Sequence, residues 1–326
     1  MILHAGTHKT GTTSIQRTLA SNREWLRDHG IRYPDTRPFL GGSRDGHFRV
    51  AHALTGTDPA ALQAVRDLAA HLAAEASDEE TVVLSAEPVY RHVAGTRDTW
   101  SVPDYWPRRE RYLATVAEVF ADFDVTVLLH LRDHASLAES LYLEAVAAGT
   151  CRSSFERFLV DRQPFFDYSA QVRAFEGVFD DVVVERYRGD AVGAVLTRLG
   201  LPEPPTGSAT IARRSPDPRL ALWLRTGTAA DRRRRRRFLG SPWARGALPD
   251  GEPGGLWRSA AQRDAFVAQF KGPYGHDFFP AEATPVPPPV VLTPRLRRAL
   301  DRRYRLWCLA DTVTRHRDAA GGGRHG

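Results

Sequence analysis

Short apolar runs alternate with stretches of helical periodicity along the first 200 residues of the chain. Each run is nearly continuously apolar, which is typical of strands in a parallel sheet that is covered on both faces. The predicted strands are residues 2–5, 81–86, 125–131 and 182–187. The predicted helices that separate or follow these strands are residues 12–29, 59–76, 109–120, 134–148, 153–162, 168–178 and 190–199. Strands that alternate with helices in this way predict a three-layer α/β fold, with helices on both faces of a central parallel sheet.

The C-terminal third carries a weaker pattern. Helical spacing is confined there to residues 220–224 and 257–270, and prolines and glycines crowd residues 241–255 and 280–294. This part is either a helical cap on the same domain or a small separate domain, and we favour the cap. The predicted domains are an α/β core at 1–205, a helical and loop-rich C-terminal cap packed on that core at 206–318, and a disordered tail at 319–326.

Composition narrows the class of protein. Of the 326 residues, 42% are hydrophobic and 26% are charged, as in a globular protein. No apolar run approaches the ~18–20 residues that span a bilayer, and no basic segment followed by an apolar one marks a secretory signal. We therefore expect a cytoplasmic protein whose two cysteines, Cys151 and Cys308, stay reduced. The net charge of +6 favours anionic ligands.

The sequence HAGTHKTGTT at residues 4–13 joins the first predicted strand to the first predicted helix. Its glycines, Gly6 and Gly11, let the backbone close around an anion, and the N–H groups at the start of the helix point at that anion. The hydroxyl side chains available to the same anion are Thr10, Thr12, Thr13 and Ser14. A turn from strand to helix needs only one glycine or one capping residue, so this density of donors favours an anion-binding loop.

The position of the lysine indicates which anion the loop binds. The nucleotide-triphosphatase loop G-x-x-x-x-G-K-[ST] has a lysine directly after the second glycine, where this chain has Thr12. The lysine here is Lys9, on the arch of the loop, and it is one of only two lysines among 45 basic residues. In so arginine-rich a chain, a lysine at this place suggests that a compact ammonium group is needed there. Metal-assisted chemistry on a nucleoside triphosphate is therefore disfavoured, and no metal ligand is predicted.

The sequence HKTGTT in this setting resembles the phosphosulfate-binding loop of the sulfotransferases that use 3′-phosphoadenosine 5′-phosphosulfate (PAPS). A second motif agrees, because LRDHASLAESLY at residues 131–142 closes a predicted strand and opens a helix. In that family an arginine at the end of this strand and a serine eight residues later bind the 3′-phosphate, and Arg132 and Ser140 stand at this spacing. The strand VVVERY, which ends at Tyr187, is similar to a later core strand of the family. The resemblance covers about residues 1–200 and implies a P-loop-like fold.

The resemblance also implies roles for individual residues. PAPS would be the sulfuryl donor and adenosine 3′,5′-bisphosphate (PAP) the product, with no metal required. The residues expected to bind the donor are Thr7, His8, Lys9, Thr10, Gly11, Thr12, Thr13, Arg132, Ser140 and Tyr187. Lys9 would neutralise charge on the leaving phosphate. His8 departs from the small residue that is usual at its place, and it would contact the sulfuryl group or fill space there.

A general base must accept the proton of the acceptor group. In the family this base is a histidine or a glutamate near the end of the second core strand, where this chain reads LSAEPVY, so Glu87 is the candidate. A half-buried carboxylate at a strand end can have its pKa raised toward the working range. His92 and His130 are alternatives for this role, and a helix cap or an ion pair is the other interpretation of Glu87. Ser85 is expected to help shape the pocket.

The acceptor would be a hydroxyl or amine group on a carbohydrate, a glycolipid or a small metabolite. Two predicted loops, at residues 35–58 and 88–108, are expected to wall its pocket. Trp100, Tyr105 and Trp106 lie in the second loop. Their rings suit stacking on a sugar or an aromatic group, and they suit a protein core equally well.

Three other functions remain open at this point. A small-molecule kinase that uses Mg-ATP would hold the metal with Asp133 or Glu87, but it lacks the lysine after the second glycine. A nucleic-acid-binding protein would use the six consecutive arginines at 232–237, a run more typical of a solvated helix face or a flexible loop. The same run could attract an anionic acceptor or an anionic membrane surface. The third is a relative of the sulfotransferases that binds the donor but does not catalyse transfer. Separately, Lys271 and Arg263 are weaker candidates for binding the 3′-phosphate in the sulfotransferase interpretation.

Overall fold

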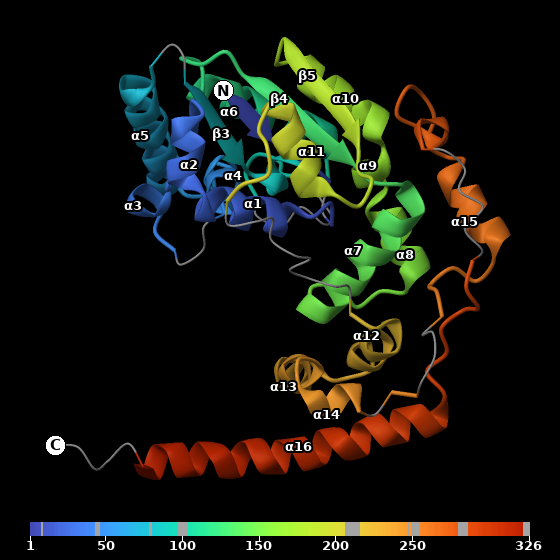
Figure 1. Ribbon diagram of the computed structural model, residues 1–326. Coiled ribbons are helices and arrows are strands. Elements are labelled where there is room, and N and C mark those ends of the chain that lie inside the picture. The colour runs from blue at the N-terminus through green and yellow to red at the C-terminus, as the bar shows by residue number, and fades with distance from the viewer. Residues whose placement is uncertain are drawn as a thin grey trace. The chain divides into compact units, whose positions relative to one another are not determined.

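Figure 1 shows the computed structural model of the chain, which describes residues 1–7, 9–42, 46–77, 80–96, 103–205, 216–246, 248–249, 254–279 and 286–321. The chain divides into two compact units, and each unit is built from stretches that are far apart in the sequence. Unit 1 contains residues 1–137, 159–214 and 266–282, and unit 2 contains residues 138–158, 215–265 and 283–326. The domain boundaries expected at residues 205 and 318 stay predictions.

Unit 1 is built around a sheet of five strands in the order β2-β3-β1-β4-β5. The strands are β1 (Ile2–His4), β2 (Ile31–Arg32), β3 (Thr81–Ser85), β4 (Thr126–Leu131) and β5 (Asp181–Arg186). Every neighbouring pair is parallel, so the predicted central parallel sheet is confirmed. The sequence pattern does not predict β2, because two residues at the edge of a sheet are too few to carry a periodic signal.

Helices of very different lengths connect these strands. Those of unit 1 are α1 (Thr12–Ser21), α2 (Arg23–Asp28), α3 (Arg37–Leu40), α4 (Phe48–Ala53), α5 (Pro59–Glu75), α6 (Tyr105–Val119), α9 (Gln163–Phe166), α10 (Tyr168–Glu176), α11 (Ala191–Arg198) and the 3₁₀ turns η1 (Glu87–Tyr90) and η2 (His276–Phe278). The single helix predicted at 12–29 is interrupted at Asn22, whose side chain donates to the Thr18 carbonyl at 2.7 Å in competition with the helix backbone. The loop predicted at residues 35–58 is wrong in part, since it contains α3 and α4.

Helices cover both faces of the sheet (Figure 1). Successive residues of a strand point to opposite faces, and Leu128 of β4 packs with residues of α1 and α11 in one apolar cluster. Val127 and Leu129 therefore face the other side, where both are fully buried. Helices α5, α6 and α10 pack against one another in unit 1, with α6 between the other two. The predicted α/β arrangement, a sheet flanked by helices, is thus confirmed.

The segment at residues 266–282 completes unit 1 from the far end of the sequence. The Phe270 ring stacks on His134, with 4.8 Å between ring centres and 8° between ring planes. Phe266 and Phe270 both pack against Phe166 of α9, at 5.3 and 6.1 Å between ring centres. An aromatic core that begins in the α/β part is therefore closed by residues that follow most of unit 2 in the chain.

Unit 2 is helical. Its helices are α12 (Pro218–Arg225), α13 (Ala229–Leu239), α14 (Pro242–Arg245) and α16 (Pro294–Gly321), and three more run from one unit into the other: α7 (His134–Ala148), α8 (Phe155–Asp161) and α15 (Ala260–Val267). Its core joins Trp223 of α12 and Phe238 of α13 to a stripe on α16, formed by Leu296, Leu300 and Tyr304. Within the described part of the chain, no helix is both long enough and apolar enough to cross a membrane.

Candidate functional site

The predicted anion-binding loop at residues 4–13, called the phosphate loop from here on, begins at the end of β1 and ends at the first turn of α1. Two residues of this loop have a left-handed backbone: Gly11, with a φ of 76°, and Lys9, with a φ of 69°. Glycine adopts this conformation readily, whereas a lysine there carries strain of about 1 kcal/mol or more. A larger residue at position 11 would also collide with α11, because a Cβ atom there would come within 2.7 Å of the Ala191 Cβ. The loop is therefore held in one tight shape.

Hydrogen bonds tie the loop to the end of β4 and leave donors at its centre. The Thr7 N–H group donates to the His130 carbonyl at 2.9 Å, and the Thr10 hydroxyl donates to the Thr7 carbonyl at 2.6 Å. The first N–H group of α1 with a backbone acceptor is that of Ser14, so the N–H groups before it point out of the helix start. The Thr12 hydroxyl is buried and has no partner among the described residues. A buried, partnerless hydroxyl beside a helix N-terminus fits a bound anion such as a phosphate group.

Arg132 connects this loop to the second predicted motif. Its Nη1 group donates to the Lys9 carbonyl at 3.0 Å, and its Nε group donates to the Ser136 hydroxyl at 2.8 Å. The Tyr168 hydroxyl donates to the Arg132 carbonyl at 2.6 Å, and the guanidinium carbon lies 5.9 Å from the centre of the Tyr187 ring. Two motifs that lie 123 residues apart in the sequence therefore meet in space. The Nη2 group of Arg132 can still donate to a ligand.

A row of four polar side chains crosses the sheet next to the loop, one each from β3, β1, β4 and β5. The Ser85 hydroxyl lies 2.9 Å from Nδ1 of His4. His4 Nε2 lies 3.1 Å from Nδ1 of His130, and His130 Nε2 lies 3.1 Å from Oε2 of Glu185. His4 and His130 are each 1% exposed, whereas Glu185 is half-buried. The row thus runs from the end of β3, through the protein interior, to a carboxylate that reaches solvent.

Burial sets the charge of this polar row. Burial, with a smaller contribution from His130, lowers the pKa of His4 to about 3, and the charge of Glu87 acts in the opposite direction. Burial also lowers the pKa of His130, against the raising effect of Glu185. Both imidazoles are therefore neutral near neutral pH. A single direction of hydrogen bonding then satisfies the row: Ser85 donates to His4, His4 donates to His130, and His130 donates to the Glu185 carboxylate.

The three candidates for the general base have different surroundings. Glu87 is half-buried at the first position of η1, directly after β3, and its charge acts on His4. His130 is a member of the polar row. His92 is 1% exposed, and its ring centre lies 4.6 Å from that of His52. Of the three, Glu87 is the one that is partly exposed, and a base must reach a bound acceptor.

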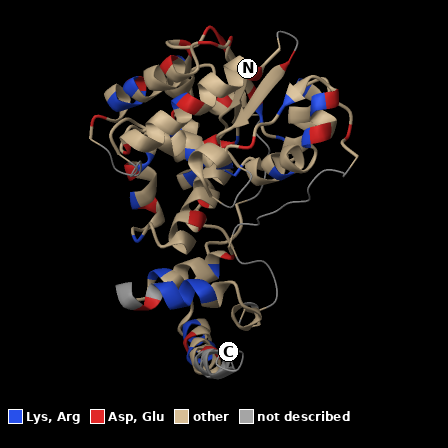
Figure 2. Cartoon of the chain, turned by 90° about the vertical axis from the view of Figure 1, so that its left-hand side faces the viewer, with Lys and Arg blue, Asp and Glu red and all other residues tan. Residues whose placement is uncertain are grey.

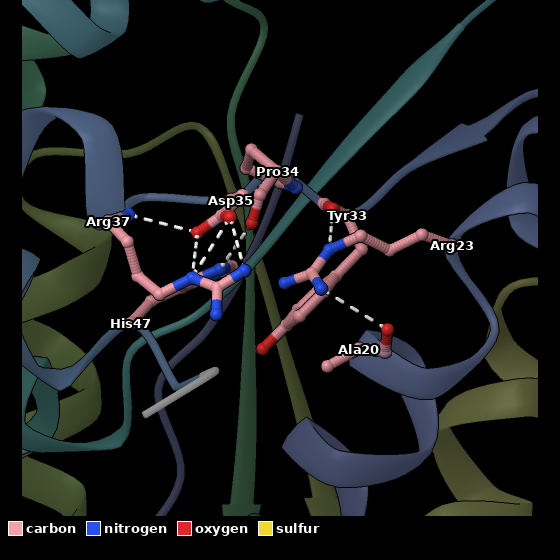
Figure 3. Close-up of polar contacts among 7 residues, drawn as sticks. All are labelled: Ala20, Arg23, Tyr33, Pro34, Asp35, Arg37 and His47. Atoms are coloured by element: carbon pink, nitrogen blue, oxygen red, sulfur yellow. Dashed lines mark hydrogen bonds and ion pairs between the residues drawn. The ribbon is translucent and has the colours of Figure 1, made fainter. Parts of the chain in front are cut away.

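A buried histidine anchors the segment that follows β2 to the end of β3. His47 Nε2 donates to the Pro34 carbonyl at 3.0 Å (Figure 3). His47 Nδ1 accepts from the Ser85 N–H group, at the end of β3, at 3.1 Å. The His47 ring stacks on Tyr33 with 4.4 Å between ring centres, and burial lowers the pKa of His47 to about 4. Arg23 holds the same segment, because its Nε group donates to the Tyr33 carbonyl at 3.1 Å. The first of the two predicted pocket walls therefore begins on a fixed support.

A pocket of about 460 Å³ opens at the carboxyl end of β5. Two of its lining residues, Tyr187 and Ala191, also stand against Gly11 of the loop. Its other lining residues are His130, Val184, Glu185, Arg186, Arg188, Asp190, Ala194 and Phe278. Two arginines and a tyrosine in this lining suit a ligand that combines an anionic group with a flat ring.

Three predicted residues are not brought into this group. His8 lies outside the described residues, and its predicted contact with the sulfuryl group stays a prediction. Ser140 is buried in the part of α7 that belongs to unit 2, so its predicted pairing with Arg132 also stays a prediction. Lys271 is exposed, and its carbonyl accepts a hydrogen bond from the Ser169 hydroxyl at 2.9 Å.

Of the aromatic residues expected to suit acceptor binding, those that the structure describes lie in the core. Trp100 lies outside the described residues. Tyr105 is buried in an apolar cluster with Val93 and Phe165, and Trp106 packs against that cluster. These two rings are therefore parts of the core, the second of the two interpretations that their sequence context allowed.

The polar row and the histidine anchor contain residues that the sequence analysis does not assign to a site, namely His4, Glu185 and His47. A signal for His4 exists in the sequence, since it is a titratable residue in an otherwise apolar predicted strand. Such a residue must find a polar partner when the strand is buried. The identity of that partner depends on the strand order, which the sequence pattern does not contain.

No protein-family model matches the chain, and no curated protein matches it. The chain is similar to a solved structure, the crystal structure of a sulfotransferase from Alicyclobacillus acidocaldarius. The two chains are 19% identical, the match covers 68% of this chain and 89% of the other, and the TM-score is 0.37. A likeness at this score carries no weight for fold or function, so an assignment of function depends on the residues of this chain.

Proposed function

We propose that this protein is a sulfotransferase, which transfers a sulfuryl group from PAPS to a hydroxyl or amine group of an acceptor. One observation carries the proposal: the Arg132 guanidinium donates to the Lys9 carbonyl at 3.0 Å, which joins the two motifs that resemble the family's phosphate-binding motifs. The left-handed Gly11, the helix N-terminus and the partnerless Thr12 hydroxyl fit a 5′-phosphate group in the loop.

The reaction needs three tasks from the residues of this chain. PAPS supplies a sulfuryl group that is activated by its bond to the 5′-phosphate. That sulfur–oxygen bond breaks, a bond forms from sulfur to the acceptor oxygen or nitrogen, and the acceptor proton leaves. Lys9 would neutralise the charge on the leaving phosphate, while the N–H groups at the start of α1 would hold it in place. Glu87 would accept the proton of the acceptor.

The protein would discriminate between the donor and ATP by binding the 3′-phosphate, which ATP lacks. The Nε and Nη1 groups of Arg132 are engaged with Ser136 and with the phosphate loop, which fixes the direction of the remaining Nη2 group. This fixed donor would bind the 3′-phosphate, together with Ser140 as the resemblance implies. The pocket lined by Tyr187 and Arg188 would take the adenosine part of the donor.

Calorimetric titration with PAP, and separately with Mg-ATP, tests the donor site. We expect PAP to bind without metal and more tightly than Mg-ATP. Arg132→Ala should weaken PAP binding by about 100-fold, because it removes charge-assisted hydrogen bonds and the brace on the loop. Arg173→Ala removes an exposed arginine of the same unit and should change nothing. A preference for Mg-ATP that is indifferent to Arg132 would overturn the proposal in favour of a kinase.

The variant Thr12→Val separates a ligand-binding hydroxyl from a structural one. Since the Thr12 hydroxyl has no partner among the described residues, its loss should leave the unfolding midpoint unchanged or raise it slightly. The same change should weaken PAP binding by about tenfold. An unchanged affinity would remove Thr12 from the site. Sulfuryl transfer from PAPS to a panel of acceptors, followed by PAP release, then distinguishes an enzyme from a relative that only binds the donor.

A further inference from the structure

Two helices of unit 2, α13 and α16, are rich in arginine, which Figure 2 draws as blue ribbon. The exposed arginines are Arg233, Arg234, Arg236 and Arg237 on α13, and Arg295, Arg297, Arg298, Arg302 and Arg305 on α16. Within the described part of the chain, none of them forms an ion pair. The two helices pack against each other, so their charges belong to one surface region of unit 2.

One acidic residue of each helix contacts an arginine in the interior of unit 2. Asp231 of α13 and Asp301 of α16 both contact Arg235, at 2.7 and 3.7 Å. Arg235 itself is partly buried, with its guanidinium carbon 4.3 Å from the centre of the Trp223 ring. The inner arginine is therefore paired with carboxylates, whereas the exposed arginines form no ion pair among the described residues.

One face of α16 combines arginines with exposed apolar side chains. We define the outer face of α16 as Arg295, Arg298, Arg302, Arg305, Leu306 and Leu309. The four arginines recur at intervals of three and four residues, which places them on one side of the helix, opposite to the buried stripe that enters the core of unit 2. Leu309 continues the same row and is 67% exposed, and Leu306 beside it is 49% exposed.

Other exposed apolar side chains belong to the same unit as this face. Of the five large apolar side chains that the described residues expose, four belong to unit 2: Trp243, Val291, Leu306 and Leu309. Trp243 lies on α14, which packs against α16, and it is 41% exposed. Tryptophan is enriched where proteins meet the surface of a bilayer. Exposed leucines together with arginines on one helix face are typical of a helix that lies in the plane of a membrane interface.

We propose that the outer face of α16 binds the surface of a membrane that contains anionic lipids. The arginines would attract the lipid head groups, and Leu306 and Leu309 would enter the boundary between head groups and acyl chains. The exposed arginines of α13 add to the positive field around this face. A nucleic-acid duplex would also be attracted by the arginines, but it would leave both leucines in water. The leucines therefore favour the lipid surface.

The test is co-sedimentation of the full chain with phosphatidylcholine vesicles, with and without roughly one-third phosphatidylserine. We expect binding only to the anionic vesicles, and weaker binding as the salt concentration rises. The outer-face variant replaces Arg295, Arg298, Arg302 and Arg305 by glutamine. It should bind at least about 100-fold more weakly, since each arginine near an anionic surface contributes roughly fivefold.

A matched control removes the same charge from unit 1, by replacing Arg27, Arg111, Arg173 and Arg198, all of them exposed, by glutamine. This control should bind anionic vesicles within about twofold of the unchanged protein, because these positions lie outside the proposed face. Equal losses in both variants would overturn the proposal, since net charge alone would then explain the binding.

The variant Leu306→Ser with Leu309→Ser tests insertion into the lipid surface. Both side chains are exposed, so the fold should be unaffected, and binding to anionic vesicles should fall by about tenfold. Vesicle binding that ignores this change, and that a DNA duplex abolishes by competition, would overturn the proposal and assign the arginines to nucleic acid. An unchanged protein that does not sediment with anionic vesicles would overturn it as well.

Discussion

Replacing Gly11 by alanine tests the packing between the phosphate loop and α11. Two separate costs follow from the structure. The φ of Gly11 is 76°, and an alanine in this left-handed region costs about 1 kcal/mol. The new Cβ would also lie 2.7 Å from the Ala191 Cβ, and overpacking of this kind costs about 1–3 kcal/mol. We therefore expect Gly11→Ala to lower the free energy of unfolding by about 2–4 kcal/mol.

Gly56 separates the backbone cost from the steric cost. Its φ is 70°, and no atom lies within 4 Å of a Cβ placed on it, so Gly56→Ala should cost only about 1 kcal/mol. Ala191→Gly removes the contact from the other side. In a double-mutant cycle of Gly11→Ala with Ala191→Gly, the contact should appear as a coupling energy of about 1–3 kcal/mol.

Urea-induced unfolding, followed by circular dichroism, measures all four free energies of the cycle. Titration with PAP on the same variants then shows whether the displaced loop still binds its ligand, and we expect Gly11→Ala to weaken PAP binding. A coupling energy near zero, together with equal costs for Gly11→Ala and Gly56→Ala, would refute the steric reasoning. It would mean that the loop moves away from α11 at little cost.

Two further predictions concern buried charge. Burial lowers the pKa values of His4 and His47 in the folded protein to about 3 and about 4, against an unfolded value of about 6.5. As the pH falls below about 6.5, these two histidines bind protons in the unfolded chain but not in the folded one. The folded state therefore loses stability. Between about pH 7 and pH 5, these two residues should lower the free energy of unfolding by roughly 4 kcal/mol. In denaturant titrations, His47→Gln should reduce that loss by about half. A variant with the same pH dependence as the unchanged protein would contradict this prediction. In unit 2, Arg235→Met should cost about 2 kcal/mol in thermal unfolding, because it removes the ion-pair partner of Asp231 and leaves that partly buried carboxylate with the Tyr304 hydroxyl alone. Arg233→Met on the same helix should cost less than about 0.5 kcal/mol, because Arg233 is exposed.

Most of the sheet could be predicted from the sequence because β3 and β4 are mainly apolar and β5 contains three consecutive valines, at residues 182–184. β3, β4 and β5 lie within one or two residues of the predicted runs. The prediction fails where an element is short or its apolar face is narrow. α16 is missed because arginines surround a stripe of one apolar residue every four positions, at Leu296, Leu300 and Tyr304, and the preceding prolines dominate the local composition.

The site could be predicted only in part. The loop at residues 4–13 and Arg132 are recognisable because their chemistry lies in local spacing. The polar row is not, because it depends on β1 lying between β3 and β4, and this order is a property of the folded sheet. Only the folded chain shows that His4 and His130, 126 residues apart, share a hydrogen bond.

The segment at residues 266–282 also governs how the protein can be synthesised. Phe266 and Phe270 close the aromatic core around Phe166, yet the ribosome reaches them only after making most of unit 2. At ~5–20 residues per second, this segment is made roughly 4–15 s after residue 205. During that interval the aromatic surface around Phe166 is exposed, and chaperones or neighbouring nascent chains can bind it. A protein truncated after residue 205 would keep that surface exposed, because it lacks the segment at residues 266–282 that belongs to the same unit.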